Sequence, residues 1–394
     1  MTSMGKTRRM MSLGLCGVAL TAALAAPAHA VPTTAEPRRP APAQGLPGGA
    51  AGGRTAADRA ETAYGRVPGW RLKETGTEVR FRGLAAVGRA DAWVAGSDGT
   101  VLRTADGGRS WRNVSPPGAA ELEFRDIEAF DARRAVVLAI GEGEASRILR
   151  TADGGATWNE TFRNDDPRAF YDCVTFFDSR NGLALSDPVD GAYRILSTGD
   201  GGRSWRVLPG AGMPAALPGE AGFAASGQCL VSAGPSDVWL ATGGGATGRV
   251  LHSPDRGLNW TVAESTIPAG DPARGVFGLA FRDRTHGLAV GGDYRAGQAS
   301  PRAGAVTSDG GRTWRQAHTP PAGYRSGVTW LPHSRSAALA VGPGGTDLTT
   351  DGGLTWRTVD NGSYDTVDCA PDLGCWASGE KGRVARLEPR GRVS

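Results

Sequence analysis

Short apolar stretches recur along most of the chain, each four or five residues long and separated from the next by turns rich in Gly, Asp and Ser. The first group occupies residues 84–87, 92–96, 100–104 and 111–114. Short runs bounded by such turns predict β-strands. Because these four follow one another with short connections, they predict a four-stranded antiparallel sheet.

A turn sequence repeats after the third run of each group. Six copies share the pattern Ser/Thr-x-Asp-x-Gly-x-Ser/Thr/Asn-Trp, with successive Asp residues 47, 47, 55, 54 and 42 positions apart: Asp106, Asp153, Asp200, Asp255, Asp309 and Asp351. An isolated four-stranded sheet leaves both faces exposed, so repeats of this length stack. Radial stacking also leaves only short sheet edges. The repeat therefore predicts a β-propeller.

The residue types of the turn suit a hairpin. The Asp carboxylate can accept backbone N–H groups within the turn, Gly can adopt a positive φ without a Cβ clash, and the Trp that opens the next strand can pack beneath the turn. Since the carboxylates occur once per repeat, they cannot converge on one ion. We expect a structural role and no metal site.

Counting the repeats gives seven blades. Six contain the turn, and a last segment supplies three strands, at Thr366–Ala370, Cys375–Ser378 and Gly382–Leu387. Its missing fourth strand has a counterpart near the other end, because Gly69–Lys73 resembles Thr355–Val359, the strand that follows the sixth turn. We therefore predict an all-β, seven-bladed propeller over residues 67–388, with the last blade closed by the N-terminal strand.

The N-terminus has the features of an export signal. A basic start at Lys6–Arg9 precedes a short apolar stretch, and Ala28-His29-Ala30 fits a cleavage site, which predicts a signal peptide over residues 1–30. Thr7–Met11 also resembles a twin-arginine signal, so either export route is open. Residues 31–66 are rich in Pro, Ala and Gly and predict a disordered linker. Residues 389–394 form a tail.

Composition narrows the class of partner. The chain has 60 Gly and 25 Pro, as expected for many turns, and loss of Lys6, Arg8 and Arg9 with the leader lowers the formal charge from +4 to +1. Such a charge gives no reason to expect a nucleic-acid partner. No apolar run approaches the length of a transmembrane helix. We expect a secreted or extracytoplasmic monomer.

Four cysteines remain after the leader is removed, which favours disulfides in an oxidising compartment. Cys369 and Cys375 flank a turn, and a local disulfide is expected there. Cys173 and Cys229 fall at similar points of the first strand in adjacent blades. They either bridge two blades or are small buried residues.

Residues 92–111, AWVAGSDGTVLRTADGGRSW, look like the repeat of the photosystem II stability and assembly factor family, and the six turns are similar to Asp-box (BNR) repeats. The resemblance covers about residues 67–388. It implies a seven-bladed propeller that assembles a membrane complex through protein contacts. Asp-boxes also occur in sialidases, sorting receptors and exported bacterial proteins, some labelled oxidoreductases. The resemblance is therefore specific for fold and weak for function.

Residues that enter the first strand of each blade are the candidate binding site, because they should line the mouth of the central channel. Their mixture of cationic, aromatic and polar side chains suits an anionic or carbohydrate-like ligand. The alternative is a solvated mouth whose charges pair with one another. The candidates are Arg82, Arg125, Tyr171, Asp172, Gln228, Phe277, Arg325, Tyr364 and Asp365. Two long loops, 209–227 and 291–302, are expected on the same face.

We expect a non-enzymatic scaffold that binds a protein or glycan partner in the cell envelope, without a cofactor. A sialidase-like glycoside hydrolase is the main alternative, with Arg82, Arg125 and Arg325 as an arginine triad and Tyr171 or Tyr364 as nucleophile. The chain lacks the Arg-Ile-Pro or Arg-Leu-Pro motif of sialidases, and sialidases have six blades. An oxidoreductase has less support, since no GxGxxG or CxxCH motif is suitably placed.

Overall fold

The computed structural model describes residues 69–296 and 300–388. The predicted signal peptide, linker and C-terminal tail lie outside this range. The described residues belong to one compact unit. Besides strands, they form two single-turn 3-10 helices, η1 (Gly143–Ala145) and η2 (Gly210–Gly212).

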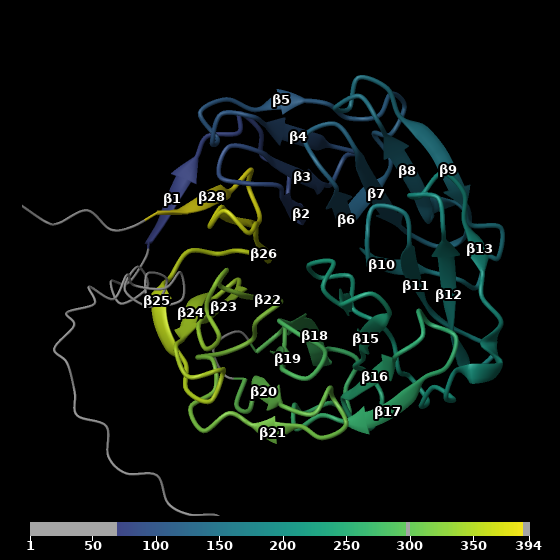
Figure 1. Ribbon diagram of the computed structural model, residues 1–394, viewed down its shortest axis with the longest axis vertical. Coiled ribbons are helices and arrows are strands. Elements are labelled where there is room, and N and C mark those ends of the chain that lie inside the picture. The colour runs from purple at the N-terminus through teal and green to yellow at the C-terminus, as the bar shows by residue number, and fades with distance from the viewer. Residues whose placement is uncertain (1–68, 297–299, 389–394) are drawn as a thin grey trace, which may run out of the picture. The chain divides into compact units, whose positions relative to one another are not determined.

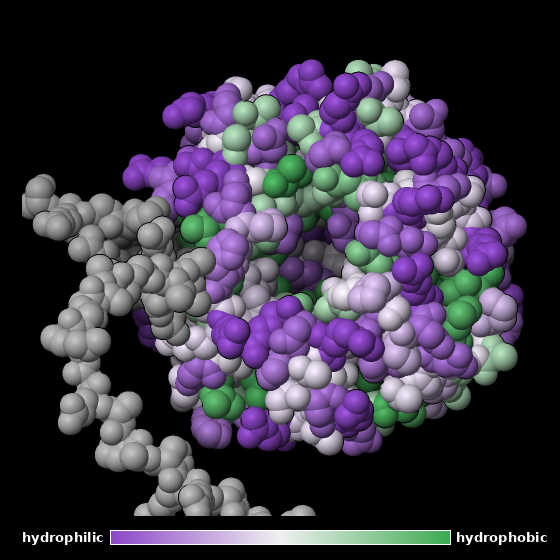
Figure 2. Space-filling model, viewed as in Figure 1, coloured by the Kyte–Doolittle hydropathy of each residue, from purple (hydrophilic) through white to green (hydrophobic). Residues whose placement is uncertain are grey.

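Seven four-stranded antiparallel sheets form a ring, which confirms the predicted seven-bladed β-propeller (Figure 1). The space-filling view from the same side shows a hollow at the centre of the ring (Figure 2). The strands of each blade are called A to D from the inside outward. Blade 1 comprises β2 (Phe81–Ala86), β3 (Ala92–Gly96), β4 (Val101–Thr104) and β5 (Arg112–Asn113). Blade 2 comprises β6 (Glu123–Ala129), β7 (Ala135–Ile140), β8 (Arg147–Thr151) and β9 (Asn159–Arg163). Blade 3 comprises β10 (Tyr171–Phe176), β11 (Gly182–Val189), β12 (Ala192–Thr198) and β13 (Arg206–Val207). Blade 4 comprises β14 (Leu230–Ala233), β15 (Asp237–Ala241), β16 (Arg249–Ser253) and β17 (Thr261–Glu264). Blade 5 comprises β18 (Arg274–Phe281), β19 (Gly287–Asp293), β20 (Gly304–Thr307) and β21 (Arg315–Gln316). Blade 6 comprises β22 (Gly327–Trp330), β23 (Ala338–Gly342), β24 (Gly345–Thr349) and β25 (Arg357–Asp360).

Blade 7 combines both ends of the described chain. It contains β26 (Thr366–Cys369), β27 (Cys375–Ser378), β28 (Val384–Glu388) and, as its outer strand, β1 (Gly69–Lys73). Strand β1 pairs with β28 from Gly69 opposite Glu388 to Lys73 opposite Val384. The indole N–H of Trp70 donates to Thr346 Oγ1 in blade 6 at 2.9 Å. Closure of the last blade by the N-terminal strand is therefore confirmed.

The hydrophobic core lies between neighbouring blades. Each blade is covered on both sides, so its second strand is apolar on both faces, as in the uninterrupted buried run Ala135–Ala139 of β7. Trp93, Trp239 and Trp376 occupy the same point of strand B in three blades and are completely buried. Their regular occurrence reflects packing between blades, as where Trp93 meets Trp158 of blade 2 edge to face at 6.4 Å.

The six repeated turns contain the hydrogen bonds expected from their residue types. In blade 1, Asp106 Oδ1 accepts the backbone N–H groups of Arg109 and Ser110 at 2.9 and 3.0 Å. The side chain of Ser110, together with these amides, lowers the pKa of Asp106 to about 2. Gly108 has a φ of +78°, and a Cβ there would come within 2.8 Å of Lys73. We call these six segments the Asp turns.

One long loop departs from expectation. We predicted that residues 209–227 lie at the channel mouth throughout, but the first part runs along the outside of the ring. The carbonyl of Gly212 accepts the backbone N–H of Trp260, which follows the Asp turn of blade 4. A Cβ on Gly212 would lie 2.1 Å from the carbonyl oxygen of Leu258 in that turn, so this contact requires glycine. The later part, from Ala216 onward, crosses to the mouth.

Candidate functional site

Four β-bulges direct side chains into one pocket. In blades 1, 2, 3 and 5, the pairing of strand A with strand B skips one residue close to the start of strand A. A bulge leaves the extra residue unpaired and re-aims its side chain. All four bulged residues line a single pocket of about 610 Å³ at the inner ends of the blades: Arg82, Arg125, Asp172 and Phe277. Asp365 of blade 7, also predicted, lines it too.

An aromatic wall forms one side of the pocket. Phe223, from the loop before blade 4, stacks on Phe277 with ring centroids 4.1 Å apart and an interplanar angle of 13°. Tyr324 meets Phe277 edge to face at 4.8 Å, and Tyr294 does so at 6.2 Å. The side chain of Tyr294 is 54% exposed, which leaves part of this wall open to a ligand.

Arginines from blades 1 and 2 supply the positive charge. Arg80 is fully engaged, since its Nε and Nη2 each donate to Asp365 at 2.7 Å. Arg125 donates to Glu123 at 2.8 Å and to the carbonyl of Ala224 at 2.8 Å. Arg82 shares Glu123 with Arg125, at the longer distance of 3.9 Å. Burial and the neighbouring Arg125 lower the pKa of Arg82 to about 10. Arg82 is therefore the least neutralised cation in the pocket.

A pair of carboxyl groups faces these arginines. Asp172 and Asp187 both line the pocket, on neighbouring strands of blade 3. Asp187 is itself a bulged residue, in β11, and accepts the backbone N–H of Gly222 at 2.7 Å. Burial raises the pKa of Asp187 to about 6, and burial together with the charge of Asp187 raises the pKa of Asp172 well above its usual value. Each carboxylate thus makes ionisation of the other less favourable.

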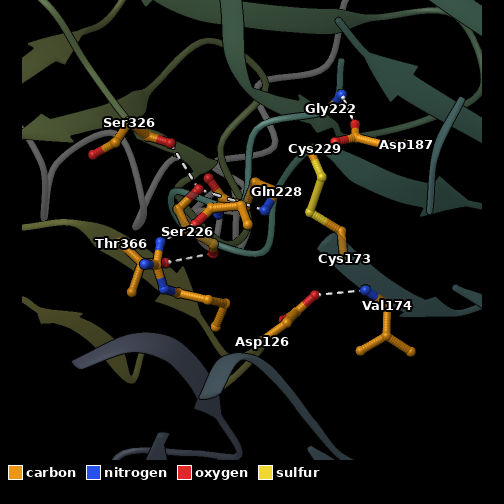
Figure 3. Close-up of a disulfide and its surroundings, with 12 residues drawn as sticks. Asp126, Cys173, Val174, Asp187, Gly222, Ser226, Gln228, Cys229, Ser326 and Thr366 are labelled. Carbon is orange, nitrogen blue, oxygen red and sulfur yellow. Dashed lines mark hydrogen bonds between the residues drawn. A yellow bond between two sulfur atoms is a disulfide. The ribbon is translucent and has the colours of Figure 1, made fainter. Parts of the chain in front are cut away.

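Residues 222–228, which we call the axial segment, line part of the pocket and reach the inner strands of other blades. Gly222, Ser226 and Gln228 of this segment are drawn in Figure 3. The side chain of Gln228 accepts the backbone N–H of Val328 in blade 6 and donates to the carbonyl of Val367 in blade 7. Ser226 likewise donates to the carbonyl of Ser326 in blade 6 at 2.7 Å. Because these partners lie on several blades, the axial segment ties the inner strands together.

Both pairs of cysteines form disulfides. Cys173 on strand A of blade 3 is bonded to Cys229 at the end of the axial segment, with the Cα atoms 6.1 Å apart (Figure 3). The first of the two alternatives, a bridge between adjacent blades, is therefore correct. Cys369 and Cys375 form the expected local bond across the turn of blade 7. The first disulfide fixes the floor of the pocket to its wall.

Four predicted residues lie elsewhere. Tyr171 precedes the bulge of its strand, so its ring turns into the core against Phe162, and burial raises its pKa to about 12. Gln228 lies in the axial segment. Arg325 is completely buried and donates to Asp347 at 2.8 Å. Tyr364 packs on Trp70, with ring centroids 5.5 Å apart.

The arginine triad imagined for a sialidase-like site is consequently not assembled. Arg82 and Arg125 share the pocket, but Arg325 is held inside blade 6 by Asp347. Neither Tyr171 nor Tyr364 lines the pocket. In addition, the described residues contain no group of three or more His, Cys, Asp or Glu side chains placed to hold a metal ion.

Several residues that line the pocket are not among those predicted from the sequence. Arg80 precedes strand A by one residue, and Tyr324 and Tyr294 come from connecting segments. Phe223 belongs to the long loop that we identified without assigning its residues to the site. Asp187 comes from the end of strand B, where a second bulge turns it inward. The length of the loop that contains Phe223 was the one feature of the sequence that indicated a functional segment.

No protein-family model and no curated protein sequence matches the chain. Solved structures do share its fold. YCF48 bound to a D1 peptide aligns with a TM-score of 0.58 and 14% identity, over 81% of this chain and 94% of that one. YCF48 from Cyanidioschyzon merolae aligns with a TM-score of 0.58 and 16% identity, over 82% of this chain and 99% of that one.

A hydrolase shares the fold as well. The GH74 xyloglucanase from Xanthomonas campestris aligns with a TM-score of 0.56 and 16% identity, over 82% of this chain and 54% of that one. This chain thus corresponds to about half of the xyloglucanase. At such identities the likeness concerns the fold alone, which is compatible with a binding role or with catalysis. The choice between a binding role and catalysis depends on the pocket.

Among the described residues, no helix is long and apolar enough to cross a membrane.

Proposed function

We propose that this protein is a secreted, non-enzymatic binding or assembly scaffold that holds a protein or glycan partner of the cell envelope at the mouth of the propeller. The observation that carries the proposal is the position of Arg82. Its side chain is 18% exposed in the pocket, and the nearest carboxylate, Glu123, is already bonded to Arg125. An anionic group on the partner would give Arg82 a close counter-ion of its own.

The rest of the pocket fits binding. One wall is aromatic, and the floor is fixed by a disulfide and by hydrogen bonds to several blades. A rigid, partly apolar pocket with a few convergent polar groups is typical of ligand sites, and rigidity lowers the cost of ordering on binding. The shared fold of YCF48 bound to a D1 peptide favours a protein partner. Export is supported by the leader sequence and by the two disulfides.

The carboxyl groups argue against a two-carboxylate glycosidase. Such enzymes place their acids about 5 to 9 Å apart, on opposite sides of the scissile bond. Asp172 and Asp187 instead lie on neighbouring strands of the same blade, and Asp365 is occupied by Arg80. We therefore do not propose a hydrolase.

The test compares Arg82→Ala with wild type on a peptide library and on an array of acidic and neutral glycans. Loss of a charge-assisted contact weakens binding by roughly tenfold or more. Arg71→Ala is the matched control, because Arg71 lies on outer strand β1 and its side chain is 71% exposed. Binding that is equal in Arg82→Ala and wild type, or no ligand on either array, would contradict the proposal.

A further inference from the structure

A second hollow continues the pocket outward across blade 3. This outer groove has a volume of about 820 Å³ and shares Phe170 and Asp187 with the pocket at the mouth. The backbone N–H of Asp187 donates to the carbonyl of Phe170 at 2.9 Å, so these two residues form a fixed boundary between the two hollows. The two hollows therefore lie next to each other on either side of Phe170 and Asp187.

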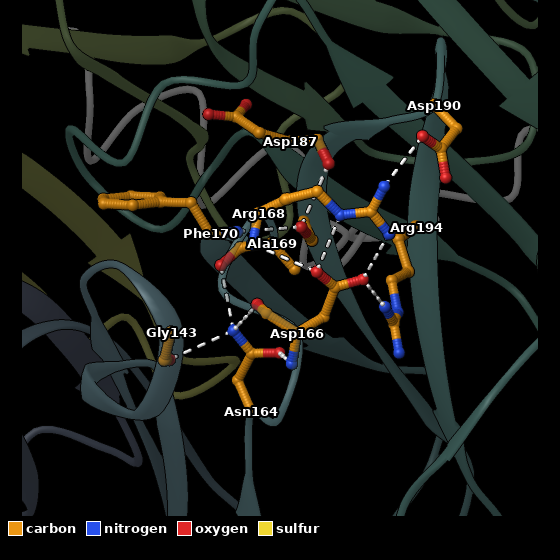
Figure 4. A network of polar contacts seen from close by, with 10 residues as sticks. Gly143, Asn164, Asp166, Arg168, Ala169, Phe170, Asp187, Asp190 and Arg194 are labelled. Carbon is orange, nitrogen blue, oxygen red and sulfur yellow. Dashed lines mark hydrogen bonds and ion pairs between the residues drawn. The ribbon is translucent and has the colours of Figure 1, made fainter.

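One wall of the outer groove is locked by a network around Asn164 (Figure 4). The completely buried side chain of Asn164 donates to the carbonyls of Gly143, Asp166 and Ala169. The carboxylate of Asp166 binds Arg168 at 3.0 Å and Arg194 at 2.9 Å. This network holds Pro167 and Phe170 in place.

The opposite wall is equally constrained. Its segment runs from Ala216 to Glu220, and the backbone N–H of Ala216 donates to the carbonyl of Gly191. Glu220 is buried and forms an ion pair with Arg249, whose Nε donates to Oε1 at 2.7 Å. Glu220 also accepts the hydroxyl of Thr242 and the backbone N–H of Leu217. Both walls are therefore formed before any ligand arrives, which favours binding of an extended chain.

The chemistry of the outer groove favours a polypeptide over a sugar. Its lining includes Pro167, Pro188, Leu217 and Pro218. Of the four charged residues that line the outer groove, Arg168, Asp187 and Glu220 each have a partner within the protein, whereas Glu142 is exposed. A glycan would need free polar groups for its hydroxyls, whereas apolar and proline side chains need only surface contact.

We propose that the two hollows form one binding trough for an extended polypeptide segment, with apolar or proline side chains in the outer groove and the anionic contact at Arg82. This inference rests on the proposed function and extends it to a partner class and a direction across blade 3. Two observations support it: the hollows share Phe170 and Asp187, and three of the four charged residues of the outer groove have partners within the protein.

Peptides selected on wild type from a random displayed library provide the probe. Pro167→Glu and Pro218→Glu place charges on exposed groove residues, and each is expected to weaken binding of the selected peptide about tenfold or more. Leu72→Glu is the control, because Leu72 is 54% exposed on β1 in blade 7 and a charge there should change nothing. Circular dichroism and unfolding curves check that the variants remain folded.

Crosslinking supplies a second readout. A benzophenone at one end of the peptide should label residues 167–170 or 216–220, and at the other end residues 80–82 or 222–225. Labelling confined to the mouth, or a peptide lost with Arg82→Ala but unaffected by both groove variants, overturns the trough and leaves the proposed function intact. Binding of glycans alone has the same meaning. Absence of any ligand overturns both.

Discussion

Arg82 and Arg125 occupy equivalent bulged positions in neighbouring blades and converge on one carboxylate, Glu123, at 3.9 and 2.8 Å. The two guanidinium groups therefore share a single counter-ion at the mouth of the ring. This arrangement results from two local breaks in strand pairing. It leaves Arg82 3.9 Å from a carboxylate that is already bonded to Arg125, so a ligand can approach its guanidinium group.

The two disulfides should differ in their contribution to stability. The Cys173–Cys229 bond closes a loop with a sequence separation of 56, and the Cys369–Cys375 bond closes one of 6. Because a longer loop loses more entropy when it is closed in the unfolded chain, replacing the first pair with Ala should cost about 4 kcal/mol and the second about 2 kcal/mol. Guanidinium unfolding of the two double variants measures this order. Equal losses in the free energy of unfolding would show that the length of the closed loop does not set the contribution of each disulfide.

Gln228→Leu should destabilise the ring. The change leaves the buried N–H of Val328 without its acceptor and removes the bond to the carbonyl of Val367, which should cost about 1–3 kcal/mol. Gln316→Leu is the control, since Gln316 donates one bond to Gly304 within blade 5. Chemical unfolding compares the two variants. A smaller loss for Gln228→Leu than for Gln316→Leu would argue against a tie across the axis.

Stability should fall as the pH rises from about 4 to about 8. Burial raises the pKa of Asp126 to about 8, and the pKa values of Glu128 and Asp368 are also raised by burial. An unfolded Asp titrates near about 3.9. Between these values the folded protein holds protons that the unfolded chain releases, so the free energy of unfolding decreases with pH.

Asp126→Asn removes one of these groups and should gain stability relative to wild type between pH 5 and pH 8. Asp106→Asn is the control. Hydrogen bonds from Ser110 lower the pKa of Asp106 to about 2, so this carboxyl is ionised throughout the range and its loss should shift stability by a constant amount. Unfolding curves at several pH values test both. An unchanged slope in Asp126→Asn would mean that Asp126 is ionised in the folded state.

Sequence alone predicted the ring because its signals are local. Each Asp turn encodes its own hydrogen bonds, and Gly69–Lys73 resembles the strand after the sixth turn closely enough to assign it to blade 7. The site was only partly predictable. Whether Arg82 faces the pocket or Tyr171 faces the core depends on a bulge, and a one-residue change of register reverses the side chains. Gly83 and Gly278 follow two of the four bulges, which is a weak signal.

The axial segment could not be foreseen, since its partners lie far away in the sequence. The side chain of Gln228 is hydrogen-bonded to Val328 and Val367, which lie 100 and 139 positions later in the chain. These hydrogen bonds exist only once the ring is closed. The same holds for Phe223, which reaches Phe277 in the next blade from within a long loop. Contacts of this kind depend on how neighbouring blades pack, and the packing of blades cannot be predicted from the composition of the loop.

Hydrogen exchange of the protein, measured with and without the selected peptide, locates the binding surface without any mutation. If the peptide binds at the mouth of the propeller, exchange should slow in residues 123–126, 222–228 and 277–279, around the pocket, and stay unchanged in the Asp turns. Slower exchange confined to the Asp turns or to the outer strands would contradict a binding site at the mouth of the propeller.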